Sequence, residues 1–269
     1  MSYLNFGLIK KETFKTKSQT LLNMDKKKIK SNAKKIWHFI WEEDSLASWA
    51  VNIILAFVLI KFLVYPGLGL VLGTKYPIVA VVSGSMEHNT VPICSQYDSN
   101  GKCLKFDSDY GEICGKRQKS TYFMNFEEYW ATCGDWYITN TNITKNEFES
   151  FMFKRGFNTG DIMLLYKPKP ENIKVGDTIV FTTSSRPDPI IHRVIKTWKD
   201  ESGKTYFQTK GDHNSGINYQ VTEQKISEDR YLGKAFIRVP YLGWIKIAFV
   251  KGINFCVNGL VTFINWTQN

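Results

Sequence analysis

Residues 161–198 read DIMLLYKPKPENIKVGDTIVFTTSSRPDPIIHRVIKTW. This stretch contains three short runs that are rich in β-branched and aromatic residues, at 161–167, 177–183 and 190–198. Runs of this length between turn residues are typical of β-strands. Further runs of the same kind lie at 76–84, 205–211 and 232–241. Together they predict a mainly β domain, built as an antiparallel sheet or a partly open barrel.

An insertion at residues 89–155 interrupts this pattern. It contains four of the five cysteines, at Cys94, Cys103, Cys114 and Cys133. In an oxidising compartment four cysteines indicate two disulfides, and their spacing leaves the pairing open. A zinc site is the alternative, but the close CxxC pairs typical of zinc ribbons are missing. We therefore predict two disulfides, and we expect no metal and no cofactor.

An apolar run precedes the first predicted strand. Residues 49–74 read WAVNIILAFVLIKFLVYPGLGLVLGT, with Lys61 as the one charged residue. A helix needs roughly 20 apolar residues to cross the hydrocarbon core of a membrane. Trp49 and Tyr65 suit the membrane interfaces, and Lys61 can extend its charge toward one of them. The run predicts a transmembrane helix rather than a buried core helix.

Basic residues are concentrated ahead of this run. Residues 1–36 hold ten lysines and two acidic residues, so they carry most of the net charge of +10. Because this charge lies at one end, it argues against a nucleic-acid-binding surface. Short basic segments beside a span remain in the cytoplasm. We expect a cell-membrane protein with a cytoplasmic segment at 1–48 and an extracytoplasmic domain at 75–241.

A second apolar stretch, residues 242–266, lies near the end of the chain. It has the length of a span, but it contains Lys246, Lys251, Asn254 and Asn258. A second transmembrane helix and an interfacial amphipathic helix both fit this composition. We favour a span, which would return the end of the chain to the cytoplasm.

Candidate chemistry lies in VSGSMEH, residues 82–88, after the first predicted strand. A serine becomes a nucleophile when a base takes its proton, and the histidines on the predicted outer side are His88, His192 and His213. A lone histidine in a strand, such as His192, is more often structural than catalytic. Asp212 could orient an imidazole, although an aspartate in a turn usually bonds nearby backbone N–H groups.

The order of the sequence blocks resembles the type I signal peptidases of the archaeal and endoplasmic-reticulum type. SGSME (83–87), behind a membrane anchor, resembles the nucleophile box of that family. IIHRVI (190–195) resembles its general-base box, and TKGDHN (209–214) resembles its acid box. The strand boxes are matched by GFNTGDIMLLYK (156–167), IKVGDTIVF (173–181) and LGKAFIRVPYLGWI (232–245). The resemblance implies a membrane-bound serine endopeptidase that cleaves signal peptides from secreted and membrane preproteins.

Roles for individual residues follow from this resemblance. Ser85, directly before the methionine, matches the nucleophile, and Ser83 matches a position whose hydroxyl helps to hold the oxyanion. His192 stands where the archaeal and endoplasmic-reticulum type has its general base. Bacterial members carry a lysine there, so a related peptidase with a lysine base is one alternative. Asp212 matches the first acid of the acid box and is predicted as the catalytic acid.

One position departs from the family pattern. Members commonly carry a second aspartate shortly after the first, and here Asn218 occupies that position. An asparagine can accept a hydrogen bond from imidazole, but it has no charge to stabilise an imidazolium. The third member of the site is therefore Asp212 or one of three later acids, Glu223, Glu228 and Asp229.

Substrate recognition and partners are implied by the same resemblance. Signal peptides with small residues before the cleavage site are the expected substrates, and Ile78, Val79 and Val81 are predicted to line shallow pockets for them. The lipid bilayer and the protein translocation channel are the expected partners, without nucleic acid. The non-enzymatic alternative is a disulfide-stabilised extracellular binding module on a membrane stalk.

Overall fold

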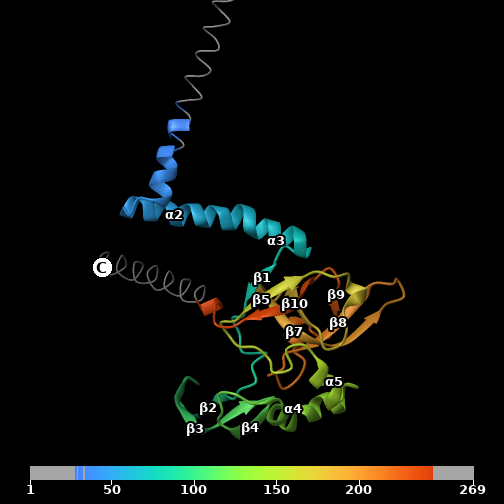
Figure 1. Ribbon diagram of the computed structural model, residues 1–269. Coiled ribbons are helices and arrows are strands. Elements are labelled where there is room, and N and C mark those ends of the chain that lie inside the picture. Colours follow the sequence, from blue (N-terminus) through green and yellow to red (C-terminus); the bar gives the residue numbers. More distant parts are fainter. Residues whose placement is uncertain (1–27, 29, 33, 245–269) are drawn as a thin grey trace, which may run out of the picture. The chain divides into compact units, whose positions relative to one another are not determined.

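The structure is a computed structural model that describes residues 28, 30–32 and 34–244 (Figure 1). Most of the lysine-rich segment, and the predicted second membrane helix apart from its first three residues, lie outside these residues. The chain divides into two compact units, residues 1–66 and 67–269.

A long apolar helix, Leu46–Leu72, confirms the helix predicted near the N-terminus. It consists of α2 (Leu46–Leu59), the π-helical turn η1 (Ile60–Val64) and α3 (Tyr65–Leu72). Ser45 caps its start by accepting a hydrogen bond from the backbone N–H of Ser48, and Gly73 follows its end with a φ of +66°. The helix has 27 residues and contains an 18-residue window with a mean hydropathy of 2.3, so its length and composition suit a membrane span.

Seven strands form the larger sheet in the order β1-β5-β10-β6-β7-β8-β9, and every neighbouring pair is antiparallel. In chain order they are β1 (Ile78–Ala80), β5 (Ile162–Tyr166), β6 (Thr178–Thr183), β7 (Arg186–Lys199), β8 (Thr205–Lys210), β9 (Ile226–Ser227) and β10 (Tyr231–Val239). Six of them coincide with or overlap the six predicted runs, which confirms the mainly β, antiparallel domain. β7 starts four residues before its predicted run, and β10 starts one residue before its run. β9 has two residues and is too short to leave a pattern in the sequence.

Both faces of this sheet are covered at its centre. On β6, Val180 packs with Met163 and Leu165 of β5 on one side, whereas Ile179 and Phe181 belong to a second apolar cluster. Side chains alternate between the two faces of a strand, so burial on both faces explains why β6 reads as a continuous apolar run. Short 3₁₀ turns, η2 (Pro170–Asn172) and η3 (Tyr219–Val221), complete this part of the chain.

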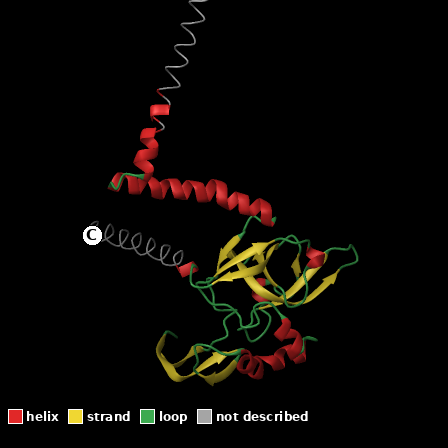
Figure 2. Cartoon of the chain, in the orientation of Figure 1, coloured by secondary structure: helices red, strands yellow, loops and turns green. Residues whose placement is uncertain are grey.

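The insertion folds into a second layer with its own sheet, which was not predicted. β2 (Val91–Tyr97), β3 (Cys103–Ile113) and β4 (Lys116–Lys119) form three antiparallel strands, followed by α4 (Phe126–Asn140) and α5 (Lys145–Ser150). Figure 2 shows these two helices beside the smaller sheet. Asn125 and Thr144 begin the helices as capping boxes with Glu128 and Glu147.

Two disulfides cross-link the insertion, as predicted. Cys94 pairs with Cys103 across the β2–β3 hairpin, and Cys114 pairs with Cys133 of α4. All four sulfur atoms are therefore used in covalent bonds, which removes the zinc alternative for these cysteines. The second disulfide ties the helical part of the insertion to the end of its sheet.

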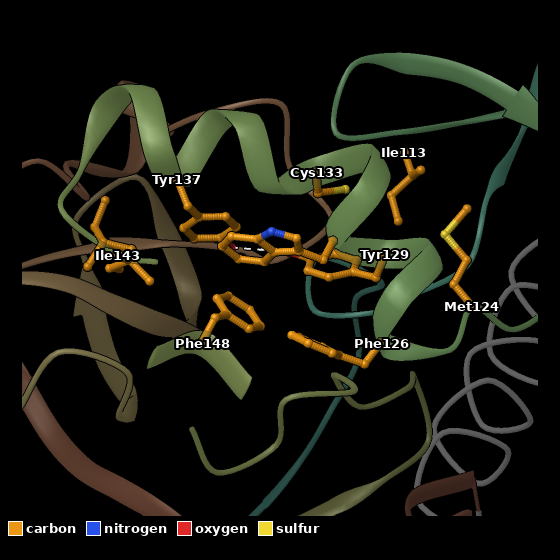
Figure 3. Packing of buried hydrophobic residues seen from close by; sticks show 10 residues of the cluster. Ile113, Met124, Phe126, Tyr129, Cys133, Tyr137, Ile143 and Phe148 are labelled. Carbon is orange, nitrogen blue, oxygen red and sulfur yellow. Dashed lines mark hydrogen bonds between the residues drawn. The ribbon is translucent and has the colours of Figure 1, made fainter. Parts of the chain in front are cut away.

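Aromatic side chains form the core of the insertion (Figure 3). The buried ring of Phe148 on α5 lies against four rings of α4, namely those of Phe126, Tyr129, Trp130 and Tyr137. Ile195 of β7 belongs to the same cluster, so the insertion packs directly on the larger sheet. The insertion is therefore part of the folded core of this unit.

Replacement of Phe148 by alanine tests this packing. We expect Phe148→Ala to lower the free energy of unfolding by about 3–5 kcal/mol, because it opens a cavity among buried rings. Phe123→Ala is the control, since Phe123 is 59% exposed in the same insertion and its loss should change stability by less than about 0.5 kcal/mol. Denaturant unfolding in detergent measures both. Equal effects of the two variants would contradict this account.

Candidate active site

Ser85 lies in the turn that follows β1. The next residue, Met86, is fully buried in the cluster under β5, β6 and β10, which holds the turn in place. The carbonyl oxygen of Ser85 accepts a hydrogen bond from the backbone N–H of His213 (2.9 Å). These contacts present the Ser85 hydroxyl to β7, where Oγ lies 2.8 Å from Nε2 of His192.

His192 joins Ser85 to a buried carboxylate. The ring lies on β7, and its Nδ1 is hydrogen-bonded to Oε1 of Glu223. Glu223 is fully buried, and its carboxylate also accepts hydrogen bonds from the backbone N–H of Asn218 (2.7 Å) and the hydroxyl of Thr209 (3.3 Å). An ionised carboxylate only accepts, so Nδ1 carries the proton and Nε2 is free to accept the proton of Ser85. The three side chains form one hydrogen-bonded chain.

Asn218, which stands where the family commonly has a second aspartate, has a structural role. Its side-chain Oδ1 accepts a hydrogen bond from the backbone N–H of Gln220 (3.0 Å) and thereby caps η3. This turn, followed by Thr222 in the left-handed region, brings Glu223 back toward His192. The carboxylate therefore comes from a residue further along the loop, which family spacing alone did not indicate.

Asp212 does not take the position that the acid box implied. Among the described residues, the carboxylate bonded to His192 is that of Glu223, whereas Asp212 forms an ion pair with Arg193. Nε of Arg193 lies 2.9 Å from Oδ1 of Asp212, and Nη2 lies 2.7 Å from Oδ2. His192 and Arg193 are adjacent on β7, so their side chains point to opposite faces of the sheet. Asp212 therefore lies on the side away from Ser85.

The Asp212 carboxylate is the centre of a buried polar network. Burial favours a higher pKa, but the charge of Arg193 and the hydrogen bonds from His88 and Arg193 hold the pKa of Asp212 well below its usual range. Nε2 of His88 donates to Oδ2 of Asp212 (3.1 Å), and the His88 ring stacks on Tyr129. Burial lowers the pKa of His88 below its ordinary value, with Asp212 opposing the shift. His88 is thus a neutral structural link, not a base for Ser85.

α4 holds the same loop from the insertion side. The hydroxyl of Tyr129 donates to the backbone carbonyl of Asp212 (2.9 Å), and the hydroxyl of Tyr137 donates to Oδ1 of its carboxylate (3.3 Å). The insertion therefore supports the loop that follows β8, directly beside His192. Nothing in the cysteine pattern predicted this connection.

Lys210 is a buried basic group near the site and could be considered as a lysine base. Burial lowers its pKa to about 8, with Asp212 and Glu223 opposing the shift. Its Nζ, however, donates to the carbonyl oxygens of Gly211 (2.9 Å) and Asp212 (3.3 Å). The group hydrogen-bonded to the Ser85 hydroxyl is His192.

A cavity of about 570 Å³ opens beside Ser85 and His192. Its walls come from the end of β1, the β6–β7 hairpin and the loop after β8. Ser83 lines it, with Oγ 3.3 Å from Oγ of Ser85. Of the three predicted pocket residues Val81 lines this cavity, whereas Val79 packs toward the core and Ile78 lies further back on β1. Ala80 and Val82 are lining residues that the sequence did not single out.

Asp212→Asn tests the buried ion pair. We expect a loss of about 3–5 kcal/mol in the free energy of unfolding, because Arg193 keeps its charge and loses its anionic partner. The exposed pair of Asp135 with Lys116 is the control, and Asp135→Asn should cost at most about 1 kcal/mol. Unfolding curves of the three proteins at neutral pH give the comparison.

The same pair makes stability dependent on pH. The folded pKa of Asp212 is lowered, so its contribution is present above the unfolded pKa of about 3.9 and is lost as pH falls toward the folded value. The free energy of unfolding should therefore fall more steeply below pH of about 4 in the wild type than in Asp212→Asn. Parallel pH profiles would count against a lowered pKa.

Gly211→Ala tests the close approach of the residue after β8 to Ser85 and His192. A Cβ at this position would lie 2.7 Å from the carbonyl oxygen of Ser85 and 2.9 Å from Nε2 of His192. We expect reaction of Ser85 with a phosphonate probe to fall by at least about tenfold, since a displacement near 1 Å costs up to about 10² in rate. Gly216→Ala is the control, because its Cβ would meet only Nε1 of Trp136 at 3.5 Å. Normal labelling of Gly211→Ala would contradict the packing described.

Comparison with known proteins shows which family this chain belongs to. No protein-family model matches the chain. The signal peptidase complex catalytic subunit SEC11 of Lachancea thermotolerans is 38% identical over 115 residues, which are 41% of this chain and 68% of that protein. The SEC11 subunit of Eremothecium gossypii is 34% identical over 114 residues, with the same two shares. SEC11C of Homo sapiens is 33% identical over 95 residues, 34% of this chain and 49% of that protein, so the match spans about half of its length. By this identity and coverage, the chain belongs to the family of signal peptidase complex catalytic subunits.

Proposed function

We propose that this protein is a membrane-bound serine endopeptidase that removes signal peptides from preproteins. Ser85 is the nucleophile, His192 is the general base, and Glu223 is the carboxylate behind the imidazole. The observation that carries the proposal is the hydrogen-bonded chain from Ser85 Oγ through both nitrogens of His192 to Glu223. This arrangement of nucleophile, base and orienting acid supports acyl transfer. It argues against the alternative in which VSGSMEH, residues 82–88, is only a turn without a catalytic role.

Proton transfer begins the reaction. Oγ of Ser85 attacks the scissile carbonyl carbon while Nε2 of His192 takes the hydroxyl proton, a contribution of roughly 10²–10⁴ in rate. The carbonyl π electrons move to oxygen and form the tetrahedral oxyanion. His192 then gives its proton to the departing amine as the C–N bond breaks, and water later hydrolyses the acyl-enzyme by the same route.

Glu223 supports both protonation states of His192. It holds Nδ1–H, which fixes the tautomer that leaves Nε2 unprotonated, and its charge stabilises the imidazolium after proton transfer. The backbone N–H of Asn218 and the hydroxyl of Thr209 donate hydrogen bonds to this buried carboxylate and so replace the water it would bind in solution. A glutamate is one methylene longer than an aspartate, so it can serve from a different loop position.

The oxyanion is assigned to the Ser83 hydroxyl and the backbone N–H of Ser85. The two serine hydroxyls are 3.3 Å apart, so the Ser83 hydroxyl can reach an oxygen bound next to Ser85 Oγ. A donor of this kind contributes roughly 3–4 kcal/mol to the transition state. Asp212 and His88 hold the surrounding backbone and take no part in proton transfer.

Substrate binding is assigned to the cavity along β1. Ala80 and Val82 offer small apolar surfaces beside Ser85, and the nearly buried Val81 lies between them in the cavity wall, which suits small residues before the cleavage site. The helix Leu46–Leu72 anchors the enzyme in the bilayer that also holds its substrates, and the lysine-rich segment keeps the N-terminus cytoplasmic. The catalytic domain then lies outside, where the protein translocation channel delivers preproteins.

A precursor-cleavage assay on membranes tests the assignment. We expect Ser85→Ala and His192→Ala to lower the cleavage rate by at least about 10³-fold, and Glu223→Gln to lower it by roughly 10²–10⁴-fold. The matched control is Asp229→Asn, because Asp229 is an exposed acid that pairs with Lys204 and should leave the rate within about twofold. Asn218→Ala should retain measurable cleavage, since Asn218 is hydrogen-bonded to Glu223 through its backbone N–H and carbonyl, which alanine keeps.

The outcomes separate the alternatives. Unchanged processing by Ser85→Ala would support the non-enzymatic binding module. Wild-type cleavage by His192→Ala would support a lysine base, with Lys210→Met as the next variant. Full activity of Glu223→Gln would remove this residue from the mechanism, provided that thermal unfolding shows all variants to be folded.

A further inference from the structure

Asn142 is of interest because its side chain makes no hydrogen bond within the described part of the fold. It lies in the turn between α4 and α5, where the side chains of Asn140, Thr141 and Thr144 are hydrogen-bonded. Nδ2 of Asn140 donates to the carbonyl of Trp136 (2.8 Å), and the hydroxyl of Thr141 donates to the carbonyl of Tyr137 (2.6 Å). Asn142 is exposed, and its side chain has no hydrogen-bond partner within the described part of the chain.

The turn is anchored by packing and hydrogen bonds although its tip is exposed. Ile143 is 4% exposed and inserts into the aromatic cluster of the insertion, and its backbone N–H donates to the hydroxyl of Thr141 (3.1 Å). Thr144 caps α5 through its hydroxyl and through Glu147. The buried neighbour therefore holds Asn142 on the outside of the fold in a defined place.

Asn142 also borders an open space. A cavity of about 490 Å³ lies between this turn and the strands β7 and β8, and Asn142, Phe151 and Lys196 are among its lining residues. A bulky group attached to the amide nitrogen could occupy this space without displacing the core.

We propose that Asn142 is an N-glycosylation site. Asn142-Ile143-Thr144 is an acceptor sequon, and the two disulfides of the insertion belong to an oxidising, non-cytoplasmic compartment. In the transfer, the amide nitrogen bonds to the anomeric carbon of a lipid-linked oligosaccharide diphosphate. The bond from that carbon to phosphate oxygen breaks, the lipid diphosphate leaves, and the amide gives up one proton to a base of the transferring enzyme. This inference rests on the orientation in the proposed function, but not on its catalytic mechanism.

Synthesis of the full chain with glycosylating microsomes tests the site. We expect one mobility step that peptide N-glycosidase removes, and its complete loss in Asn142→Gln. Thr144→Ser keeps both the sequon and the helix cap and should retain the step. Thr144→Asp keeps a good cap and destroys the sequon, so it should lose the step while the protein remains folded. The chain has a second sequon at 265–267, and Asn265→Gln should retain the step.

A grafted sequon separates the site from the orientation. Asp200→Asn creates an acceptor with Glu201 and Ser202 in the exposed β7–β8 turn. A step in this variant but none in the wild type would overturn the assignment of Asn142 and leave the orientation intact. No step in either protein would overturn both the glycan and the extracytoplasmic orientation. The precursor-cleavage assay, repeated in detergent instead of on membranes, reports on the catalytic proposal independently of all these results.

Discussion

The ion pair between Arg193 and Asp212 is the contact on which the rest of the domain depends. Arg193 is completely buried, and its guanidinium donates to both oxygens of Asp212 and to the carbonyls of Met152, Phe153 and Gly176. A buried charge is tolerated only where such bonds replace water. One side chain therefore joins β7, the loop after β8, and the segment that leaves the insertion.

This contact also explains why one strand serves two purposes. His192 and Arg193 are neighbours on β7, so alternation sends the imidazole to the face of Ser85 and the guanidinium to the face of the insertion. Asp212 pairs with Arg193 on the face of the insertion, and Glu223 is hydrogen-bonded to His192 on the face of Ser85. The tyrosines of α4 and the ring of His88 surround Asp212, so the insertion stabilises the loop beside the candidate site without entering it.

Much of the fold could be predicted because it depends on local patterns. Apolar runs between turn residues predicted six of the seven strands of the larger sheet, and the four cysteines of the insertion predicted two disulfides. The β2–β4 sheet and the aromatic core of the insertion could not be predicted in this way. The residues of β2, β3 and β4 are mostly exposed and many are polar, so they form no apolar run. The buried face of α4 does follow helical spacing, at 126, 129, 130, 133 and 137, but a search for strands does not register that period. The contact with Ile195 joins segments that are far apart in the sequence. Of the residues that line the cavity beside Ser85, the sequence singled out Val81 but not Ala80 and Val82, and their role in substrate binding stays a prediction.

The sequence by itself determined the long apolar helix, the antiparallel strands and the candidate pair of Ser85 and His192, because each is encoded in a short segment or a recognisable motif. Only the tertiary structure decided which carboxylate meets His192. That choice depends on how the loop from Asn218 to Glu223 turns, and on Arg193 drawing Asp212 to the opposite face of the sheet. Such long-range competition between charges leaves no periodicity in the sequence, and it appears only when the strands and the insertion are packed together.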